Sequence, residues 1–342
     1  MHKIIKSDLN FIINKITDIK SNFNKKKILL VGGTGFIGKW LVMTFNQLNK
    51  KYKTNITIFI LTRDKYKFLK HYSEFKKIKS VIFIQGDILN FKIKNIDFDY
   101  IIHAGSDLKV EKKDQGKYLK ELSIGSKRIF GIKNKKIKTR ILFLSSGSVY
   151  KNNNAINKIG ESKFYLPSKF PIDNTYAFGK ILAEIFAKLF IKFKNKNIII
   201  VRGFSFVGPY QQFERGFAIT DFIKDSLENK DIKLNNGNNI FRSYLYIADL
   251  IIWLLHILVR SKKGEIYNVG SDKEINLTKL SKKIIKINKS GSKVIKNNNQ
   301  NKKINYYVPN IDKAKKKFNL RVWTSLEHSI DKTTTWFKSL SK

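Results

Sequence analysis

Short apolar segments recur through the first two thirds of this chain, and stretches with helical spacing separate them. Strands that are apolar on both faces are typical of a parallel sheet with helices on both sides, because the crossover connections place helices on each face. The pattern predicts an α/β fold with a doubly wound parallel sheet. The segments are residues 27–33, 55–62, 80–87, 98–105, 140–146 and 197–203.

The stretch after the first predicted strand is rich in glycine. The sequence LLVGGTGFIGKW places Gly32, Gly35 and Gly38 between that strand and the next helical segment. Gly32 suits a tight turn, Gly35 lets the backbone approach a pyrophosphate, and Gly38 lets the helix pack closely on the strand. The sequence therefore predicts a Rossmann domain that binds a dinucleotide. The expected cofactor contacts here are Gly32, Thr34, Gly35, Phe36, Ile37 and Gly38.

The end of the second predicted strand bears on the choice between NADP and NAD. It places Thr62 and Arg63 where the adenosine ribose is expected. A hydroxyl and a guanidinium suit a 2′-phosphate, which favours NADP. Asp64 would favour NAD if the register shifted by one residue, because a carboxylate accepts hydrogen bonds from ribose hydroxyls. Asp87 and Ile88, after the third strand, are expected to meet the adenine, although Asp87 could serve only the turn there.

A tyrosine and a lysine stand four residues apart on a predicted helix. In NTYAFGKILAEIF, this spacing puts Tyr176 and Lys180 on one face. An ammonium beside a phenol favours the phenolate, so Tyr176 can act as a base near neutral pH. Ser146, which ends the fifth strand, can hold the substrate hydroxyl while Tyr176 removes its proton and the cofactor accepts hydride. Lys180 would also hold the nicotinamide ribose.

The other hydroxyls of SSGSVY have weaker assignments. Ser145 is expected to be structural, and Ser148 is a candidate for a secondary substrate contact. Tyr150 could either face the substrate or pack in the interior.

Composition narrows the other classes of function. The net charge is +42, but the lysines are spread through nearly every segment, so we expect an anionic substrate and no nucleic-acid partner. The chain has no cysteine, which excludes disulfides and thiolate metal sites. Its five histidines lack metal-ligand spacing, so no metal is expected.

The remaining segments suggest the domain organisation. We expect an amphipathic helical extension over 1–26, a Rossmann domain over 27–203 with 238–262 returning to it, and a smaller substrate-binding lobe from 204–237 and 263–342. The N-terminal segment does not resemble a secretory signal, and the apolar run IIWLLHILV is too short to span a bilayer. A cytoplasmic protein without a membrane partner is expected.

The order of the motifs resembles that of the extended short-chain dehydrogenases/reductases, and more narrowly their nucleotide-sugar epimerase/dehydratase branch. The resemblance covers residues 27–275. It implies a nucleoside-diphosphate sugar as substrate, NAD or NADP as cofactor, and a role in making sugars for surface polysaccharides. The matching motifs are GGTGFIG, IIHAG, SSGSVY, YAFGK, RGFSFVGP and FRSYLYIADL.

The resemblance also implies roles for single residues. Ser146, Tyr176 and Lys180 match the family's catalytic serine or threonine, its base and its lysine. Arg242 matches an arginine that binds the substrate pyrophosphate, with a surface ion pair as the alternative. Proteins of this kind often form homodimers through the helix bearing the tyrosine and the helix before it, here near 115–132. A further matching segment lines the cofactor: His103, Ala104 and Gly105.

Two departures from the family pattern affect the expected reaction. Sugar-nucleotide 4,6-dehydratases commonly have Thr-Asp-Glu where this chain has Ser146, Gly147 and Ser148, and the acidic pair handles the eliminated water. Glycine cannot transfer a proton, so the pattern is closer to that of epimerases, although Glu161 in the following loop could substitute. Ser205 stands where related enzymes usually have an asparagine that touches the substrate phosphates.

These observations favour a C4 epimerase that oxidises the sugar to a 4-keto intermediate and re-reduces it on the other face. A 4-ketoreductase performs half of that cycle and is the nearest alternative, followed by a 4,6-dehydratase. From a different class, a non-catalytic cofactor-binding protein or a nucleic-acid-binding protein is disfavoured, because the serine, tyrosine and lysine are all present.

Overall fold

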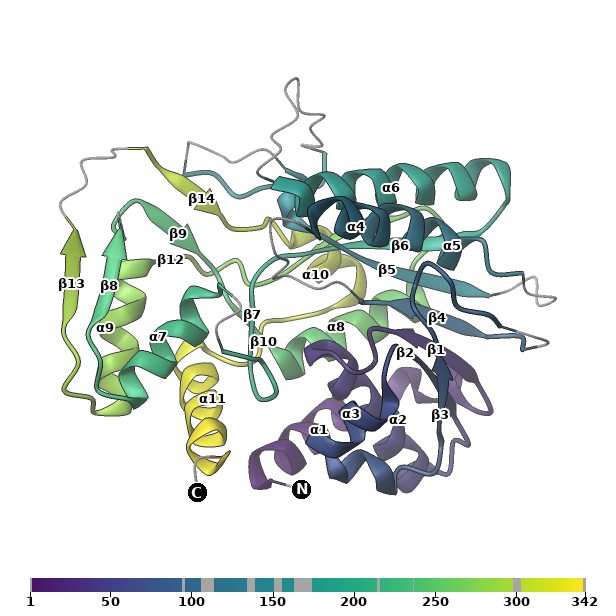
Figure 1. Ribbon diagram of the computed structural model, residues 1–342, viewed down its shortest axis with the longest axis horizontal. Helices are drawn as coiled ribbons and strands as arrows, with labels where there is room; N and C mark the ends of the chain where they lie inside the picture. Colours follow the sequence, from purple (N-terminus) through teal and green to yellow (C-terminus); the bar gives the residue numbers. More distant parts are fainter. Residues whose placement is uncertain are drawn as a thin grey trace.

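A seven-stranded parallel sheet forms the centre of the molecule (Figure 1). Its strand order is β11-β6-β5-β4-β1-β2-β3, so the chain winds outward from β1 to β3 and then continues on the other side of β1. The sheet is therefore doubly wound, and the predicted α/β class is confirmed. The computed structural model describes residues 2–93, 96–105, 114–133, 139–150, 156–162, 174–213, 216–235, 237–297 and 303–340. The strands of the sheet are β1 (Lys27–Val31), β2 (Thr57–Thr62), β3 (Val81–Gln85), β4 (Tyr100–His103), β5 (Arg140–Ser146), β6 (Asn197–Gly203) and β11 (Ile266–Val269).

Helices cover both faces of this sheet (Figure 1). Successive strand residues point to opposite faces, so Leu30 packs in the cluster with α2 and α8, while Leu29 packs in the cluster with α6. This is why both faces of each strand had to be apolar. One face carries α1 (Lys3–Lys15), η1 (Thr17–Phe23), α2 (Phe36–Tyr52), α3 (Lys65–His71), η2 (Ser73–Lys77) and α8 (Ile247–Arg260). The other carries α4 (Gln115–Lys120), the π-helical turn η4 (Glu121–Gly125), α5 (Ser126–Phe130) and α6 (Thr175–Phe193).

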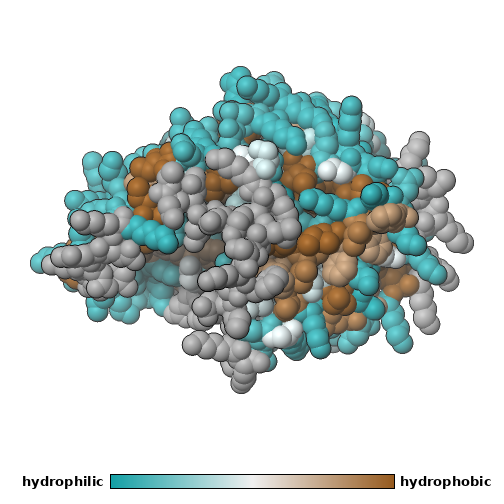
Figure 2. All heavy atoms as spheres, turned by 90° about the horizontal axis from the view of Figure 1, so that it is seen from above, coloured by the Kyte–Doolittle hydropathy of each residue, from teal (hydrophilic) through white to brown (hydrophobic). Residues whose placement is uncertain are grey.

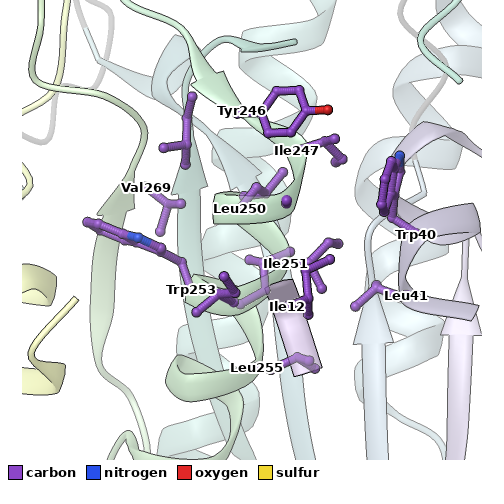
Figure 3. Packing of buried hydrophobic residues seen from close by; sticks show 14 of the residues in the cluster. Ile12, Trp40, Leu41, Tyr246, Ile247, Leu250, Ile251, Trp253, Leu255 and Val269 are labelled. Carbon is purple, nitrogen blue, oxygen red and sulfur yellow. The ribbon is translucent and has the colours of Figure 1, made fainter. Parts of the chain in front are cut away.

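Helix α8 lies at the middle of the larger apolar cluster. Every residue from Ile247 to Leu258 is buried, since the sheet lies on one side of the helix and α1 on the other. Figure 3 shows Ile251 and Trp253 of α8 among side chains that include Ile12 of α1 and Leu41 of α2.

The N-terminal helix belongs to this core. Sequence reasoning places 1–26 ahead of the main fold, but α1 packs its apolar face directly on α8 and α2. The face also carries a fully buried carboxylate, Asp8, which accepts hydrogen bonds from Tyr246 Oη and Lys332 Nζ, each at 2.5 Å. Asp8 thereby joins α1 to the start of α8 and to the C-terminal helix.

A smaller lobe lies beside the central sheet (Figure 1). It contains the sheets β12-β9-β14 and β13-β8, and the helices α7, α9 and α11 pack together next to them. The elements after β6 are β7 (Phe206–Val207), α7 (Ala218–Leu227), β8 (Ile232–Asn235), β9 (Ile240–Arg242), β10 (Leu245–Tyr246), β12 (Ile275–Asn276), α9 (Leu277–Asn288), β13 (Val294–Asn297), β14 (Asn305–Tyr307), α10 (Asp312–Phe318) and α11 (Leu326–Leu340).

Two strands depart from the expected domain boundaries. β11 lies within 263–342, which was expected in the smaller lobe, but it pairs with β6 at the edge of the central sheet. β9 lies within 238–262, which was expected to return to the Rossmann domain, but it pairs with β12 and β14. Both strands are short, so their apolar pattern does not show which sheet they join.

Two further features concern only the described part of the chain. No helix there combines the length and apolar character that crossing a membrane requires. No group of three or more His, Cys, Asp or Glu side chains there lies close enough together to hold a metal ion.

Candidate active site

The glycine turn between β1 and α2 has no room for side chains at two of its positions. Gly32 has φ +86°, and a methyl group on it would lie 2.4 Å from Gly105 Cα. A methyl group on Gly38 would lie 2.1 Å from Gly32 O. Gly35 differs, because its closest described neighbour would be Gly32 O at 3.2 Å. Gly35 is the residue before α2, and the backbone N–H groups at this helix N-terminus fit the pyrophosphate of a dinucleotide.

A buried lysine, Lys39, donates a hydrogen bond to the backbone of this turn. The sequence analysis did not identify this residue. Lys39 Nζ donates to Thr34 O at 3.2 Å and lies 4.1 Å from the ring centroid of Tyr72. Burial lowers the pKa of Lys39 to about 8. A lysine within the otherwise apolar stretch KWLV was the available signal for this contact.

At the end of β2, the acidic candidate is engaged in local structure. Asp64 Oδ1 accepts a hydrogen bond from Lys67 N at 2.9 Å and caps α3. Thr62 is buried and Arg63 is exposed. Asp87, after β3, likewise accepts a hydrogen bond from Leu89 N at 2.8 Å.

The three predicted catalytic residues come from β5 and α6. Ser146 ends β5, and its Oγ accepts a hydrogen bond from Ser148 N at 3.1 Å. Lys180 Nζ donates to Leu144 O at 2.9 Å and lies 5.8 Å from the ring centroid of Tyr176. Burial lowers the pKa of Lys180 to about 7, although the nearby Glu184 opposes the shift. The structure thus places these groups at the carboxyl end of the sheet, where open α/β folds bind ligands.

A buried ion pair fixes α6 to the strands beneath it. Arg202 on β6 donates to Glu184 on α6 through Nε at 2.9 Å and through its terminal nitrogen at 2.7 Å. Ser145 Oγ donates to the same carboxylate at 2.7 Å, a structural role as expected. These contacts hold the helix that carries Tyr176 and Lys180.

Tyr150 and Glu161 belong to the same interior network. Tyr150 Oη donates to Asn268 Oδ1 at 2.7 Å and accepts from Arg202 at 2.9 Å, so this tyrosine packs in the interior. Glu161 Oε1 accepts a hydrogen bond from Asn268 N at 3.0 Å. Glu161 is thus tied to β11, and none of its described hydrogen bonds is with Ser146.

His103 at the end of β4 makes a structural hydrogen bond. Ser126 Oγ donates its proton to Leu122 O at 2.5 Å, so His103 Nε2, 2.9 Å from the same Oγ, must be the donor. Burial and the neighbouring Lys180 lower the pKa of His103 to about 3. The imidazole is therefore neutral near pH 7 and is not an acid or base there. Ala104 continues from it toward Gly105, whose backbone contacts Gly32.

The smaller lobe brings further polar groups to this end of the sheet. Arg242 on β9 donates to Phe241 O at 2.7 Å and to Asn305 Oδ1 at 3.0 Å, and its guanidinium carbon lies 5.7 Å from the ring centroid of Tyr307. Ser205 O accepts a hydrogen bond from Leu245 N at 3.0 Å. The sequence analysis did not single out Tyr307, which comes from β14.

Replacing Lys180 by methionine tests the burial of its ammonium. The pKa of Lys180 is about 7 in the folded protein and has its ordinary value of 10.5 in the unfolded chain. Between these two pH values, Lys180 is mostly neutral when folded and mostly protonated when unfolded. The unfolded state therefore binds more protons in this interval, and Lys180 makes stability rise with pH across it. We expect the wild type to gain stability relative to Lys180→Met as pH rises above 7. Unfolding both proteins in urea at several pH values measures this, and parallel curves would contradict it.

A family model agrees with this arrangement. The model described as "NAD dependent epimerase/dehydratase family" matches residues 28–270. The chain belongs to this family. This match confirms the expected resemblance. It places the protein in a family of enzymes that includes NAD-dependent epimerases and dehydratases.

Individual relatives and structures in the family differ in reaction. The chain is 30% identical over 277 residues to a dTDP-D-glucose 4,6-dehydratase of Dictyostelium discoideum. The matched region covers 76% of this chain but only 62% of the length of that protein. Among solved structures it resembles UDP-glucuronic acid 4-epimerase from Bacillus cereus in complex with UDP-glucuronic acid and NAD, with 20% identity, a TM-score of 0.74 and coverage of 92% and 99%. It also resembles dTDP-glucose 4,6-dehydratase from Bacillus anthracis in complex with NAD, with 20% identity, a TM-score of 0.74 and coverage of 92% and 97%. At these identities the two structures establish the shared fold.

Proposed function

We propose that this protein is an NAD(P)-dependent epimerase that inverts C4 of a nucleoside-diphosphate sugar. The observation that carries the proposal is the combination of Ser146, Tyr176 and Lys180 at the sheet's carboxyl end with the acid-free residues Gly147 and Ser148 beside them. The first three groups support alcohol oxidation, and the last two do not support elimination of water. Nucleotide sugars bound to members with the same fold are consistent with the substrate class.

Each residue has a role that its position supports. Ser146 holds the C4 hydroxyl by hydrogen bonding, and Tyr176 removes its proton. Lys180 favours the phenolate by its charge. The nicotinamide cofactor, when bound, accepts and returns the hydride. Tyr176 then gives the proton back to the same oxygen, so the cycle needs no further acid. Arg242 and Ser205 would bind the substrate phosphates, and Ser148 would make a secondary contact with the sugar.

Mixing the purified protein with nucleotide sugars tests this proposal. UDP-glucose, UDP-galactose, UDP-glucuronic acid and dTDP-glucose are each added to the protein loaded with NAD or NADP. At least one sugar is expected to produce transient absorbance of the reduced nicotinamide, with sugar product formed and no net cofactor consumed. Stoichiometric accumulation of reduced cofactor together with a 4-keto sugar would instead indicate the alternative 4-ketoreductase, running here in the direction of oxidation.

The proposal includes a preference for NADP over NAD. The cap formed by Asp64 on α3 and the exposed position of Arg63 beside buried Thr62 support it. The structure of dTDP-glucose 4,6-dehydratase from Bacillus anthracis contains NAD, which favours the alternative cofactor, NAD. We expect Arg63→Ala to weaken NADP binding by roughly 10- to 100-fold, because a charged hydrogen bond contributes about 1.5–3 kcal/mol, and to leave NAD binding nearly unchanged. Calorimetric titration measures both, with Lys67→Ala as control. Equal losses for both cofactors would refute the preference.

We also propose that two copies associate through α6 and the helix before it. Seen from above, Figure 2 shows hydrophobic side chains gathered on this face of the molecule. Ile185, Leu189 and Phe193 of α6 are exposed, and so is Ile124 of η4, which packs against α6. A two-fold pairing of this helical face would cover these side chains. Light scattering is expected to give the mass of a dimer, and Leu189→Asp the mass of a monomer. A monomeric wild type would overturn this assembly.

A further inference from the structure

Gly147 leaves a space at the end of the catalytic strand, and Tyr307 fills it. A methyl group on Gly147 would lie 2.7 Å from Tyr307 Oη and 2.8 Å from Cζ of Phe204. These separations are shorter than van der Waals contact, so residue 147 cannot carry a side chain while both rings stay in place. The Tyr307 hydroxyl therefore lies in contact with the position where a side chain of residue 147 would begin.

Backbone pairing on both sides holds Tyr307 in this position. β14 runs parallel to β9, with Tyr307 opposite Arg242. Directly after β14, Ile159 N donates to Val308 O at 2.9 Å, and Asn310 N donates to Ile159 O at 2.8 Å. The segment is thus attached both to the smaller lobe and to the loop that follows β5.

The surroundings of Tyr307 are aromatic on one side and polar on the other. Its ring centroid lies 4.7 Å from that of Phe204. Its hydroxyl interacts with that of Ser146 and lies within electrostatic range of Tyr176. Burial raises the pKa of Tyr307 by more than the hydrogen bond with Ser146 lowers it, so this phenol remains protonated at neutral pH and can donate a hydrogen bond.

The hydrogen bonds of Ser146 then determine where its own proton points. A serine hydroxyl has one proton to donate and two lone pairs to accept with. Ser148 N already donates to Ser146 Oγ at 3.1 Å. If Tyr307 donates to the other lone pair, the Ser146 proton can only point away from both donors.

We propose that Tyr307 is a positioning residue, whose hydroxyl orients Ser146 so that the Ser146 proton points at the sugar oxygen being oxidised. This inference rests on the proposed function, because it assigns Tyr307 a part in alcohol oxidation. Tyr307 thus supplies a neutral donor in contact with residue 147, a position that carries no acid in this chain.

A double-mutant cycle between Tyr307 and Ser146 tests this inference. Tyr307→Phe removes the hydroxyl but keeps the ring that packs on Phe204. We expect this variant to lower kcat by about tenfold, the worth of one hydrogen bond, with KM little changed. In the Ser146→Ala background the same substitution is expected to change kcat less than twofold. Tyr306→Phe is the matched control, because the Tyr306 hydroxyl on the same strand bonds Glu274 in the smaller lobe.

The outcomes separate this inference from the proposed function. Equal losses from Tyr307→Phe in both backgrounds, or a loss no greater than that of Tyr306→Phe, would overturn the role of Tyr307. A wild-type product that is not inverted at C4 would overturn the proposed function itself. Thermal unfolding of each variant shows whether the fold is retained, and a merely structural defect would lower kcat equally in both backgrounds.

Discussion

Tyr176→Phe is expected to lower the rate of hydride transfer by about 10²- to 10⁴-fold, the usual contribution of a positioned base. The substitution removes only the phenolic oxygen, which would take the proton from the sugar. The ring stays beside Lys180, whose Nζ lies 5.8 Å from the ring centroid. Stopped-flow absorbance of the reduced nicotinamide measures the step in a single turnover.

Cofactor binding and stability should change little in the same variant. Tyr66→Phe, which alters a tyrosine that is 75% exposed, is the matched control and should keep full activity. An active Tyr176→Phe variant would mean that another group acts as the base.

Glu184→Ala is expected to destabilise the fold by about 3–5 kcal/mol, the loss typical of leaving a buried charge without its partner. The side chains of Glu184 and Arg202 are 0% and 1% exposed, and the carboxylate accepts from both Arg202 and Ser145. Without it, the guanidinium stays buried and the attachment of α6 to β5 and β6 weakens. Urea unfolding measures the change in free energy.

The double variant Glu184→Leu/Arg202→Leu separates the cost of an unpaired buried charge from the cost of losing the ion pair. Because it leaves no unpaired charge, it should be less destabilised than Glu184→Ala. A loss below 1 kcal/mol in the single variant would show that water or a rearranged partner reaches Arg202.

Local sequence patterns predicted the parts of this molecule that are built from neighbouring residues. The apolar runs gave six strands of the sheet, and the glycine spacing gave the turn before α2. The four-residue spacing of Tyr176 and Lys180 placed both on α6 near the end of β5. In each case the chemistry lies within one element or at one strand end.

Contacts between distant segments were not predicted, because no local pattern encodes them. Tyr307 reaches Gly147 only through the pairing of β14 with β9 and with Ile159. Asp8 lies on the expected amphipathic helix, but no local pattern indicates that Tyr246 and Lys332 donate hydrogen bonds to it. The sequence did not predict that β11 belongs to the central sheet, because its partner strand β6 ends at Gly203 and several elements separate it from β11, which begins at Ile266.

Product analysis tests the central claim, inversion at C4, most directly. The protein is incubated with nucleotide sugars carrying deuterium at C4, and mass spectrometry and proton NMR follow the product. We predict a product of unchanged mass that retains the deuterium at C4 and shows altered coupling around that carbon. A product lighter by one water would contradict the account, and it would mean that some group other than Gly147 and Ser148 supplies the acid for elimination.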